Sequence, residues 1–467
     1  MAGKERVSSL QGELGRMIGA DHVLAAPRDS PYNSDMARRR NLHGRADAVA
    51  LPGDAQEVAQ VVRWCYAHDV AIVPRGGGTG LTGGAVPTEG GVVLSLERLR
   101  AVRELEPGLW RMLPEAGVRT RDVQRLAREN GLFFAPDPSA SEQSQIGGNV
   151  ATNAGGAHAL KYGVTGAWVT GVEAVLAPGE LVQVGGWARK DVAGYDIKDL
   201  LIGSEGTLGV ITAVRLRLLP AREAQVAQTV FLRTRAQGCA AMLDVRAAGM
   251  EVAAMDFADG EVLAHVAGGY PGDVPAGAGF ALLIEVDGTR ERARAQASEL
   301  RDLLGGVALA IEQPRDAEAL WRWRDGFNGV LSGVRGAKVS EDVSFPIERL
   351  HEGLERFEEI ATGHGLRACA FGHGGDGNVH ATLLVDPADR AELDKAQAVG
   401  AELFELVGEL GGSIAAEHGV GWLKRGLLAS QWDARAVQLH EEIKRAFDPK
   451  GLLNPGKKLA RPPAQPS

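Results

Sequence analysis

The sequence predicts an α+β protein built from more than one domain. Its 467 residues exceed what one ordinary hydrophobic core accommodates. Residues 46–78 open with a β-α-β pattern that runs into a cluster of glycines. From about residue 221 onward, β-rich runs alternate with long amphipathic helical patterns, which is typical of a mainly antiparallel sheet flanked by helices.

The β-α-β opening consists of a strand with its turn at 46–53, a helix at 54–69 and a second strand at 70–78. Asp54 is the expected N-cap, because a short polar side chain precedes apolar residues at helical spacing. Residues 140–220 are expected to form short strands and glycine turns. Later helices are expected at 290–304, 346–365 and 436–449.

Composition restricts the function. A formal net charge of −9 argues against a nucleic-acid partner. Three cysteines far apart, with no C-x-x-C, exclude the cysteine-spaced iron–sulfur motifs and fit a reducing compartment. Without an apolar leader or a run of about 18 apolar residues, we expect no membrane span. We therefore expect a cytoplasmic protein, with peripheral attachment at the inner face of the membrane as a variant.

A glycine-rich loop follows the second strand, in the segment PRGGGTGLTGGAVP at 74–87. Gly78, Gly80 and Gly83 match G-x-G-x-x-G, but β-like residues follow instead of a helix, so the Rossmann interpretation fails. Consecutive glycines can still form a backbone nest for a pyrophosphate, and the alternative is a flexible loop. Similar segments at 136–156 and 199–212 favour a common role for all three.

Six segments together resemble the FAD-linked oxidases of the vanillyl-alcohol-oxidase flavoprotein superfamily, and within it the D-2-hydroxyacid dehydrogenases. They are PRGGGTGLTGGAVP, IGGNVATNAGG, IGSEGTLGVIT, HGGDGNVH, AEHGVG and DPKGLLNPGK, in order over about residues 45–460. The resemblance implies a two-subdomain FAD-binding fold at 1–220 and a substrate or cap domain with metal ligands at 221–418. A C-terminal segment at 419–467 is expected to return to the FAD domain.

The resemblance also implies which residues hold FAD. The first glycine loop would bind the pyrophosphate through Arg75, Gly76, Gly77, Gly78, Thr79, Gly80 and Leu81. The flavin and its ribityl chain would be lined by Pro138, Ser139, Gly148, Asn149, Thr152, Asn153, Gly155, Glu205, Gly206, Gly209, Val210 and, from the C-terminal segment, Asn454. Some members attach FAD through histidine or cysteine; no histidine lies in 69–157, so noncovalent FAD is expected.

The segment HGGDGNVH supplies side chains of metal-binding type, namely His373, Asp376, Asn378 and His380. Glu417 and His418 form a second such group. Two histidines with a carboxylate are a common divalent-metal set, whereas the alternative makes them core and surface residues. The resemblance implies that His373, His380 and Glu417 bind Zn²⁺ or Mn²⁺.

The resemblance further implies that His418 is the catalytic base and that Arg324 binds the substrate carboxylate, with Asn378 and Arg322 as further substrate-binding candidates. Oxidation of a 2-hydroxyacid needs a base for the hydroxyl proton and a hydride acceptor. A bidentate guanidinium suits the carboxylate. On spacing alone, either arginine could be a solvated helix residue.

A D-2-hydroxyglutarate dehydrogenase would need a second cation. In those enzymes a lysine precedes a D-x-S-x-P element, but here Ser340 takes that position in KVSEDVSFP and Lys338 lies two residues earlier. Thr382 also replaces an asparagine. We therefore expect D-lactate or a related short D-2-hydroxymonocarboxylate, with D-2-hydroxyglutarate dehydrogenase and a glycolate oxidase-type subunit as alternatives.

Two other functions agree less well with the sequence. An alkyl-dihydroxyacetonephosphate synthase has the same fold, but the combination of GDGNVH and EHGVG fits the metal-bearing dehydrogenases better. A non-catalytic flavoprotein subunit would be expected to lack the metal ligands, whereas this chain has His373, His380, Glu417 and His418. The sequence holds no haem C-x-x-C-H and no nicotinamide-binding Rossmann unit. Electrons are therefore expected to leave to a separate acceptor, such as a quinone, a cytochrome, an electron-transfer flavoprotein or oxygen. A homodimer is compatible with these expectations.

Overall fold

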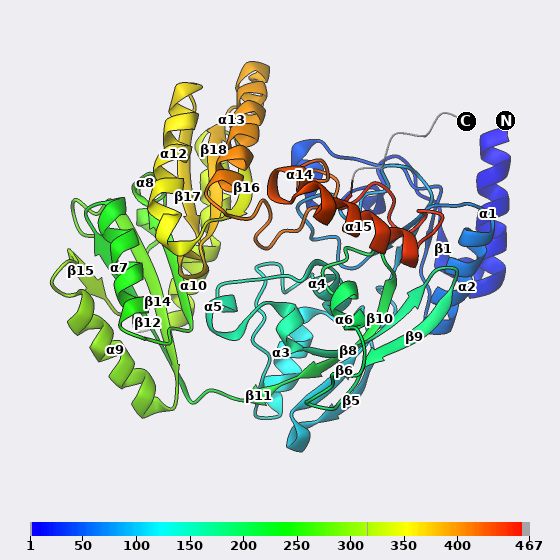
Figure 1. The fold of residues 1–467 in the computed structure, drawn as a ribbon, viewed down its shortest axis with the longest axis horizontal. Coiled ribbons are helices and arrows are strands. Elements are labelled where there is room, and N and C mark those ends of the chain that lie inside the picture. Colours follow the sequence, from blue (N-terminus) through cyan, green and yellow to red (C-terminus); the bar gives the residue numbers. More distant parts are fainter. Residues whose placement is uncertain (1, 315, 460–467) are drawn as a thin grey trace. The chain divides into compact units, whose positions relative to one another are not determined.

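The fold is that of a computed structural model, which describes residues 2–314 and 316–459 (Figure 1). Within them the chain forms two units. The first comprises residues 2–155, 164–221 and 417–459, and the second comprises 156–163 and 222–416. The short segment 156–163 thus belongs to the second unit, which its composition did not indicate. Glu417 and His418 belong to the first unit, although we had expected them in the cap domain.

The first unit contains a four-stranded sheet of order β1-β2-β4-β3. Its strands are β1 (Val23–Leu24), β2 (Ala48–Ala50), β4 (Val92–Ser95) and β3 (Ile72–Arg75). Helix α2 (Ala55–Ala67) connects β2 to β3, which run parallel to β4 as a β-α-β unit requires. Asp54 caps α2 as predicted, because its Oδ1 accepts the Glu57 N–H at 2.8 Å. Apolar side chains of α2 and of α1 (Ala2–Ile18) pack on this sheet.

The first unit also contains a five-stranded antiparallel sheet of order β5-β6-β10-β8-β9. Its strands are β5 (Val102–Glu106), β6 (Arg111–Pro114), β10 (Val210–Arg217), β8 (Val169–Leu176) and β9 (Glu180–Gly185). Val175 and Val210 join the core formed by α1 and α2, so the two sheets share one hydrophobic interior. Helix α3 (Thr120–Glu129) leads to β7 (Leu132–Phe133), which pairs with β11 (Leu219–Pro220).

Residues 146–152 form helix α4 (Ile146–Thr152), so the expectation of only strands and turns at 140–220 is wrong. Ile146 and Val150 are buried. Gly147 lies so close to Ala116 that a Cβ on the glycine would stand 2.5 Å from the Ala116 Cβ. Glycine here allows close packing of a helix, whereas sequence reasoning took it for a turn residue. Two short helices, α5 (Ala159–Tyr162) and α6 (Ile197–Leu201), were also missed.

The C-terminal part of the first unit contains α14 (Leu428–Gln431) and α15 (Ala434–Phe447). After α15 the chain runs back to β3, where Leu453 forms a parallel bridge with Ile72. The Asn454 N–H then donates to the Ile72 carbonyl at 2.7 Å. The segment NPGK is therefore anchored to the strand that carries the first glycine loop.

The second unit is built on a seven-stranded sheet in which every described pairing is antiparallel. In sheet order its strands are β15 (Ala310–Glu312), β12 (Ala224–Leu232), β14 (Phe280–Gly288), β13 (Ala254–Asp259), β17 (Arg367–Gly372), β18 (Asn378–Val385) and β16 (Ala337–Ser344). This confirms the antiparallel sheet predicted for the second half of the chain.

Helices cover both faces of the seven-stranded sheet. One face packs on α8 (Gly260–Val266), α10 (Ala317–Asp325) and α11 (Phe327–Val334). The other face packs on α7 (Arg235–Ala247), α9 (Arg290–Leu304), α12 (Leu350–Gly363) and α13 (Arg390–Glu409), of which α12 and α13 lie side by side (Figure 1). Among the described residues, no helix is long and apolar enough to cross a membrane.

Candidate active site

The three glycine segments of the first unit meet at the end of β3. A Cβ on Gly76 would stand 3.5 Å from the Gly148 Cα, and a Cβ on Gly206 would stand 3.1 Å from the Pro74 Cγ. The Glu205 N–H donates to the Ala151 carbonyl at 2.7 Å. No helix occurs between β3 and β4, both described throughout, so the first loop is not a Rossmann loop. The segments form one continuous patch of backbone and small side chains.

Asn454 ties the C-terminal segment to this patch. Its Nδ2 donates to the carbonyls of Gly84 at 2.8 Å and Glu205 at 2.7 Å. Three buried side-chain oxygens of the same segments have no hydrogen-bond partner among the described residues: Gln145 Oε1, Ser204 Oγ and Asn454 Oδ1. Buried acceptors are normally paired, so these oxygens fit a ligand with hydroxyl and imide donors, as FAD has.

The Arg75 side chain contacts residues that lie beside the first glycine loop. Its guanidinium donates to the carbonyls of Ser34 at 2.7 Å and Pro31 at 3.1 Å, and it lies over the Tyr32 ring. Burial lowers the pKa of Arg75, although the nearby Asp35 carboxylate opposes this. Arg75 thus fastens residues 31–35 beside the glycine loop.

The other flavin candidates lie on the same segments, and several have structural partners. Asn149 Nδ2 donates to Thr120 Oγ1 at 2.5 Å, Thr152 Oγ1 donates to the Gly148 carbonyl, and Asn153 Oδ1 accepts the Gly166 N–H. The hydrogen bonds of these three side chains fix the conformation of the second glycine segment, residues 136–156. The remaining candidates are Gly77, Gly78, Thr79, Gly80, Leu81, Pro138, Ser139, Gly155, Gly209 and Val210.

A row of polar side chains lies on one face of the sheet in the second unit. Side chains of equivalent register on neighbouring antiparallel strands point to the same face. Asp342 on β16 stands directly opposite His380 on β18, and His380 stands opposite Phe371 on β17. Phe371 belongs to the core formed with α8, α10 and α11. The sheet therefore carries these groups on the face that those three helices cover.

Asp256 on β13 organises this face. It is fully buried, its Oδ1 lies 2.8 Å from His373 Nδ1, and its Oδ2 accepts the Arg324 Nε–H at 2.5 Å. Burial alone would raise the pKa of Asp256, but the adjacent His373 and Arg324 offset that effect and hold the pKa below its usual range. One ionised carboxylate thus orients both an imidazole and a guanidinium.

The two histidines of HGGDGNVH lie together. The ring centroids of His373 and His380 are 5.7 Å apart, and the rings are nearly perpendicular. A carboxylate oxygen of Asp342 and a ring nitrogen of His380 lie within 4.8 Å of each other. Asn378 Nδ2 donates to Asp342 Oδ1 at 2.7 Å, so Asn378 orients this carboxylate. Asp376 is exposed.

The structure separates the two candidate arginines. Arg322 is exposed on α10 and pairs with Asp316 and Glu318. Arg324 is buried, with 6% of its surface accessible, and its Cζ lies 5.5 Å from the Phe371 ring centroid. Arg322 is therefore a solvated helix residue, and the substrate-binding role predicted for it is not supported by its position.

Glu417 and His418 lie among the glycine segments of the first unit. A Cβ on Gly155 would stand 3.1 Å from the Glu417 Cβ. His418 Nε2 lies 3.5 Å from Glu417 Oε1, and the His418 carbonyl accepts the Thr82 hydroxyl at 3.2 Å. Within the first unit, the predicted base and the predicted carboxylate ligand therefore adjoin the second and first glycine segments.

Sequence reasoning missed Asp256, Gln145 and Ser204. Asp256 could have been found, because an acid in the middle of the buried strand AMDFAD is unusual unless it is paired. The sequence distinguishes Asp342 only as the acid of the D-x-S-x-P element. Gln145 and Ser204 carry no sequence feature that distinguishes them from other polar loop residues.

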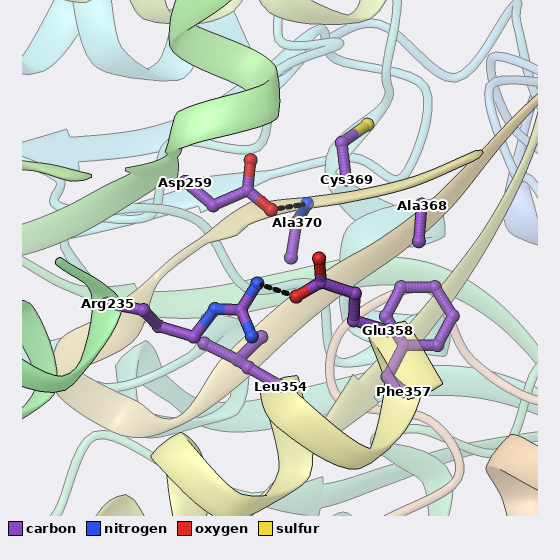
Figure 2. Close-up of a pocket in the computed structure, with 8 residues that line it drawn as sticks. All are labelled: Arg235, Asp259, Leu354, Phe357, Glu358, Ala368, Cys369 and Ala370. Carbon is purple, nitrogen blue, oxygen red and sulfur yellow. Dashed lines mark hydrogen bonds and ion pairs between the residues drawn. The ribbon is translucent and has the colours of Figure 1, made fainter. Parts of the chain in front are cut away.

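A separate hollow lies on the second unit, lined by Arg235, Asp259, Leu354, Phe357, Glu358, Ala368, Cys369 and Ala370. Figure 2 shows Asp259 bonded to the Ala370 N–H and Arg235 paired with Glu358. Asp259 also accepts the Val262 N–H at 2.8 Å and so caps α8. The hollow is built around a structural acid.

Two family profiles match the chain. The FAD binding domain profile matches residues 46–185, and the profile of the C-terminal domain of FAD linked oxidases matches residues 221–458. The fold is similar to that of p-cresol methylhydroxylase, with a TM-score of 0.80, 19% identity and coverage of 97% of each chain.

Several characterised proteins are similar along nearly the whole sequence. The glycolate oxidase subunit GlcD of Bacillus subtilis is 35% identical, covering 89% of each chain. The D-2-hydroxyglutarate dehydrogenase of Stutzerimonas stutzeri is 33% identical over 97% of this chain and 99% of its own. The D-lactate dehydrogenase of Archaeoglobus fulgidus is 33% identical over 88% of this chain and 90% of its own.

The fold and the family matches together define a flavoprotein of the vanillyl-alcohol-oxidase type. The chain belongs to the FAD-linked oxidases, in the group of 2-hydroxyacid dehydrogenases and oxidases. The family predicted from the six sequence segments is thereby confirmed.

Proposed function

We propose that the protein oxidises a D-2-hydroxyacid to the 2-oxoacid with noncovalent FAD and a divalent metal, Zn²⁺ or Mn²⁺. D-lactate or a related short monocarboxylate is the proposed substrate. The observation that carries the proposal is the pair of bonds by which Asp256 holds His373 and Arg324 together. A metal-binding imidazole and a carboxylate-binding guanidinium are thus fixed by one buried charge.

The donor chemistry of the second unit fits a divalent metal. The bond from Asp256 fixes Nδ1 of His373, which leaves Nε2 as the nitrogen for a metal, and such carboxylate–histidine pairs orient metal ligands in general. His373 and His380 would be two ligands, and Asp342 becomes an additional candidate because it adjoins His380.

Glu417 is proposed as the third ligand, because the resemblance implies it. The Ala416 N–H donates to Asp342 Oδ2 at 3.0 Å, and Glu417 and His418 are the next two residues.

Each residue has one task in the proposed reaction. Arg324 would bind the substrate carboxylate, and His418 would accept the hydroxyl proton as the α-hydrogen leaves as hydride. When bound, FAD would accept that hydride and the metal would polarise the substrate hydroxyl. The electrons would pass to a separate acceptor, for which we propose a quinone, a cytochrome or an electron-transfer flavoprotein, with the enzyme in the cytoplasm or at the inner face of the membrane.

The neighbourhood of Ser340 supports a monocarboxylate. Ser340 stands opposite Thr382, and their hydroxyl oxygens are 2.9 Å apart. These neutral groups occupy the position where the D-2-hydroxyglutarate enzymes are expected to have a lysine. A second substrate carboxylate left without a cation in a closed site would be costly to desolvate.

One observation favours the alternative, D-2-hydroxyglutarate. Lys338 Nζ lies 5.3 Å from the centroid of the Phe371 ring, the same ring that Arg324 approaches at 5.5 Å. Two residues along a strand separate Lys338 from the Ser340 position by about 6–7 Å and keep it on the same face of the sheet. A cation at this ring could serve a second carboxylate.

Anaerobic stopped-flow reduction of the bound flavin tests the proposal and the alternative together. D-lactate should reduce the flavin with a higher second-order rate constant than D-2-hydroxyglutarate or glycolate, and L-lactate should be inactive. If D-2-hydroxyglutarate is fastest and Lys338→Met removes that advantage, the alternative is correct. Acid precipitation should release all flavin into the supernatant; flavin in the pellet would contradict noncovalent attachment.

A further inference from the structure

Glu205 has an unusual environment within the first unit. It is buried, with 6% of its surface accessible, and its backbone has a φ of 54°, which non-glycine residues rarely adopt. Its Oε1 accepts the Val420 N–H at 2.9 Å and its Oε2 accepts the Gly421 N–H at 2.6 Å. Lys458 Nζ lies 3.6 Å from Oε1 and compensates the charge.

The turn that Glu205 holds begins at His418. On its other side, the Thr82 hydroxyl donates to the His418 carbonyl at 3.2 Å. The Thr82 carbonyl accepts the N–H groups of Trp422 at 2.9 Å and Leu423 at 3.1 Å. Thr82 therefore holds the two ends of residues 418–423, and Glu205 holds the middle.

Gly419 shows how closely the carboxylate approaches this turn. Its φ is 78°, and a Cβ there would stand 3.2 Å from Glu205 Oε1 and 3.3 Å from Glu205 Cδ. The Glu205 carboxylate therefore packs against Gly419, the residue between His418 and Val420. No side chain could be added at Gly419 without displacing Glu205 or straining the backbone.

We infer that Glu205 is a positioning residue for His418, and that its carboxylate does not bind FAD as the resemblance implies. The inference rests on the proposed function, in which His418 is the base. Charge-assisted bonds to two successive N–H groups fix the backbone more firmly than neutral bonds would. Because proton transfer needs accurate placement, loosening this turn should slow the reaction while leaving the flavin bound.

Glu205→Gln is the direct test, because the amide keeps the shape but has only one acceptor for the two N–H groups. We expect the limiting rate constant of flavin reduction by D-lactate to fall about 10- to 100-fold. The apparent substrate dissociation constant, the FAD content and the flavin absorption spectrum should stay close to those of the wild type.

Glu115→Gln is the matched control. Glu115 is also a buried carboxylate of the first unit that accepts a backbone N–H, from Ala101 at 2.9 Å, and pairs with a cation, Arg103 at 3.1 Å. It lies outside the turn at 418–423. This variant should lose stability but reduce its flavin at the wild-type rate, so a general effect of removing a buried charge is separated from the effect on His418.

A double variant shows whether Glu205 acts through His418. If it does, Glu205→Gln should slow reduction in the wild type but have little further effect in His418→Ala. Loss of FAD from Glu205→Gln, or wild-type reduction by it while His418→Ala is slow, would overturn the inference and leave the proposed function intact. Wild-type reduction by His418→Ala would instead remove the proposed base, and the role of Glu205 with it.

Discussion

Asp256 and His373 are joined by a 2.8 Å bond between Oδ1 and Nδ1 inside the second unit. Asp256 is fully buried, which alone would raise its pKa, yet the adjacent imidazole of His373 and guanidinium of Arg324 hold that pKa below its usual range. The carboxylate is therefore ionised at neutral pH. The N–H of a neutral His373 then lies on Nδ1, which sets the orientation of the ring.

Asp256→Asn should weaken both functions that this carboxylate supports. The neutral amide cannot form an ion pair with the guanidinium of Arg324. Its NH₂ group is a donor, so it cannot accept the hydrogen bond from whichever of Arg324 and His373 it faces. We expect about a 10- to 100-fold loss in metal affinity or in kcat/KM, as for other residues that orient metal ligands. Metal content by elemental analysis and steady-state kinetics would measure it. Full metal content with unchanged kcat/KM would refute the role.

The two arginines of α10 provide a matched comparison. Arg324→Ala should lower kcat/KM for D-lactate by about 100-fold or more, because a buried charge-assisted contact with the substrate carboxylate is lost. Arg322→Ala removes only exposed ion pairs and should stay within about 2-fold of the wild type. Equal effects of the two substitutions would show that Arg324 does not bind substrate.

Removing the proposed metal should separate its site from that of FAD. Of the candidate ligands, His380 lies on β18 and His373 lies just before it in the chain. The flavin segments are different ones, namely the loop after β3 and residues 136–156 and 199–212. Dialysis against a chelator should abolish turnover and leave the flavin spectrum largely unchanged, and Zn²⁺ or Mn²⁺ should restore activity. Full turnover by a sample shown to be free of metal would contradict the metal assignment.

Asp259 predicts a pH dependence of stability in the second unit. Burial raises the pKa of this carboxyl from 3.8 to about 7, against two backbone N–H bonds that favour the anion. The folded state then holds the proton more tightly than the unfolded state does. The associated stability is fully present below about pH 4 and is lost as the pH rises through about 7, by up to about 4 kcal/mol.

Asp259→Asn should remove that dependence, since the amide does not titrate. Its oxygen can still cap α8, although its NH₂ would oppose the Ala370 N–H and add a constant penalty. The free energies of unfolding of variant and wild type should therefore converge as the pH rises from 5 to 8. Urea unfolding across this range measures the difference, and parallel curves would exclude titration of Asp259.

The elements that the sequence predicts correctly are those set by residues close together along the chain. Helix α2 and its Asp54 cap follow from spacing and side-chain chemistry, and the antiparallel sheet follows from β-rich runs between amphipathic helices. Helix α4 was missed because Gly147 and Gly148 resemble turn residues until the contact with Ala116 is seen. Only the tertiary structure shows that these glycines serve close packing.

Residues of the candidate site that lie in short motifs could be predicted, whereas a residue that reaches the site only through tertiary structure could not. The family motifs indicate His373 and Arg324 but not Asp256, which lies far from both in the sequence. The pairing of β13 with β17 brings Asp256 to His373, and the packing of α10 on the sheet brings it to Arg324. Arg322 and Arg324 are indistinguishable in the text LWRWRD, because they differ only in which side of α10 is buried.

The interleaving of the two units along the chain limits how the protein can fold and be dissected. The first unit consists of three stretches and the second of two, so neither is contiguous in sequence. Residues 164–221 return to the first unit after the eight residues 156–163, and residues 417–459 must wait for 195 residues, 222–416, to be synthesised. Such distant pairings slow folding and leave β-strands exposed meanwhile. Truncation at any single peptide bond will therefore leave a partial unit, and point variants are the suitable tools for assigning roles in this enzyme.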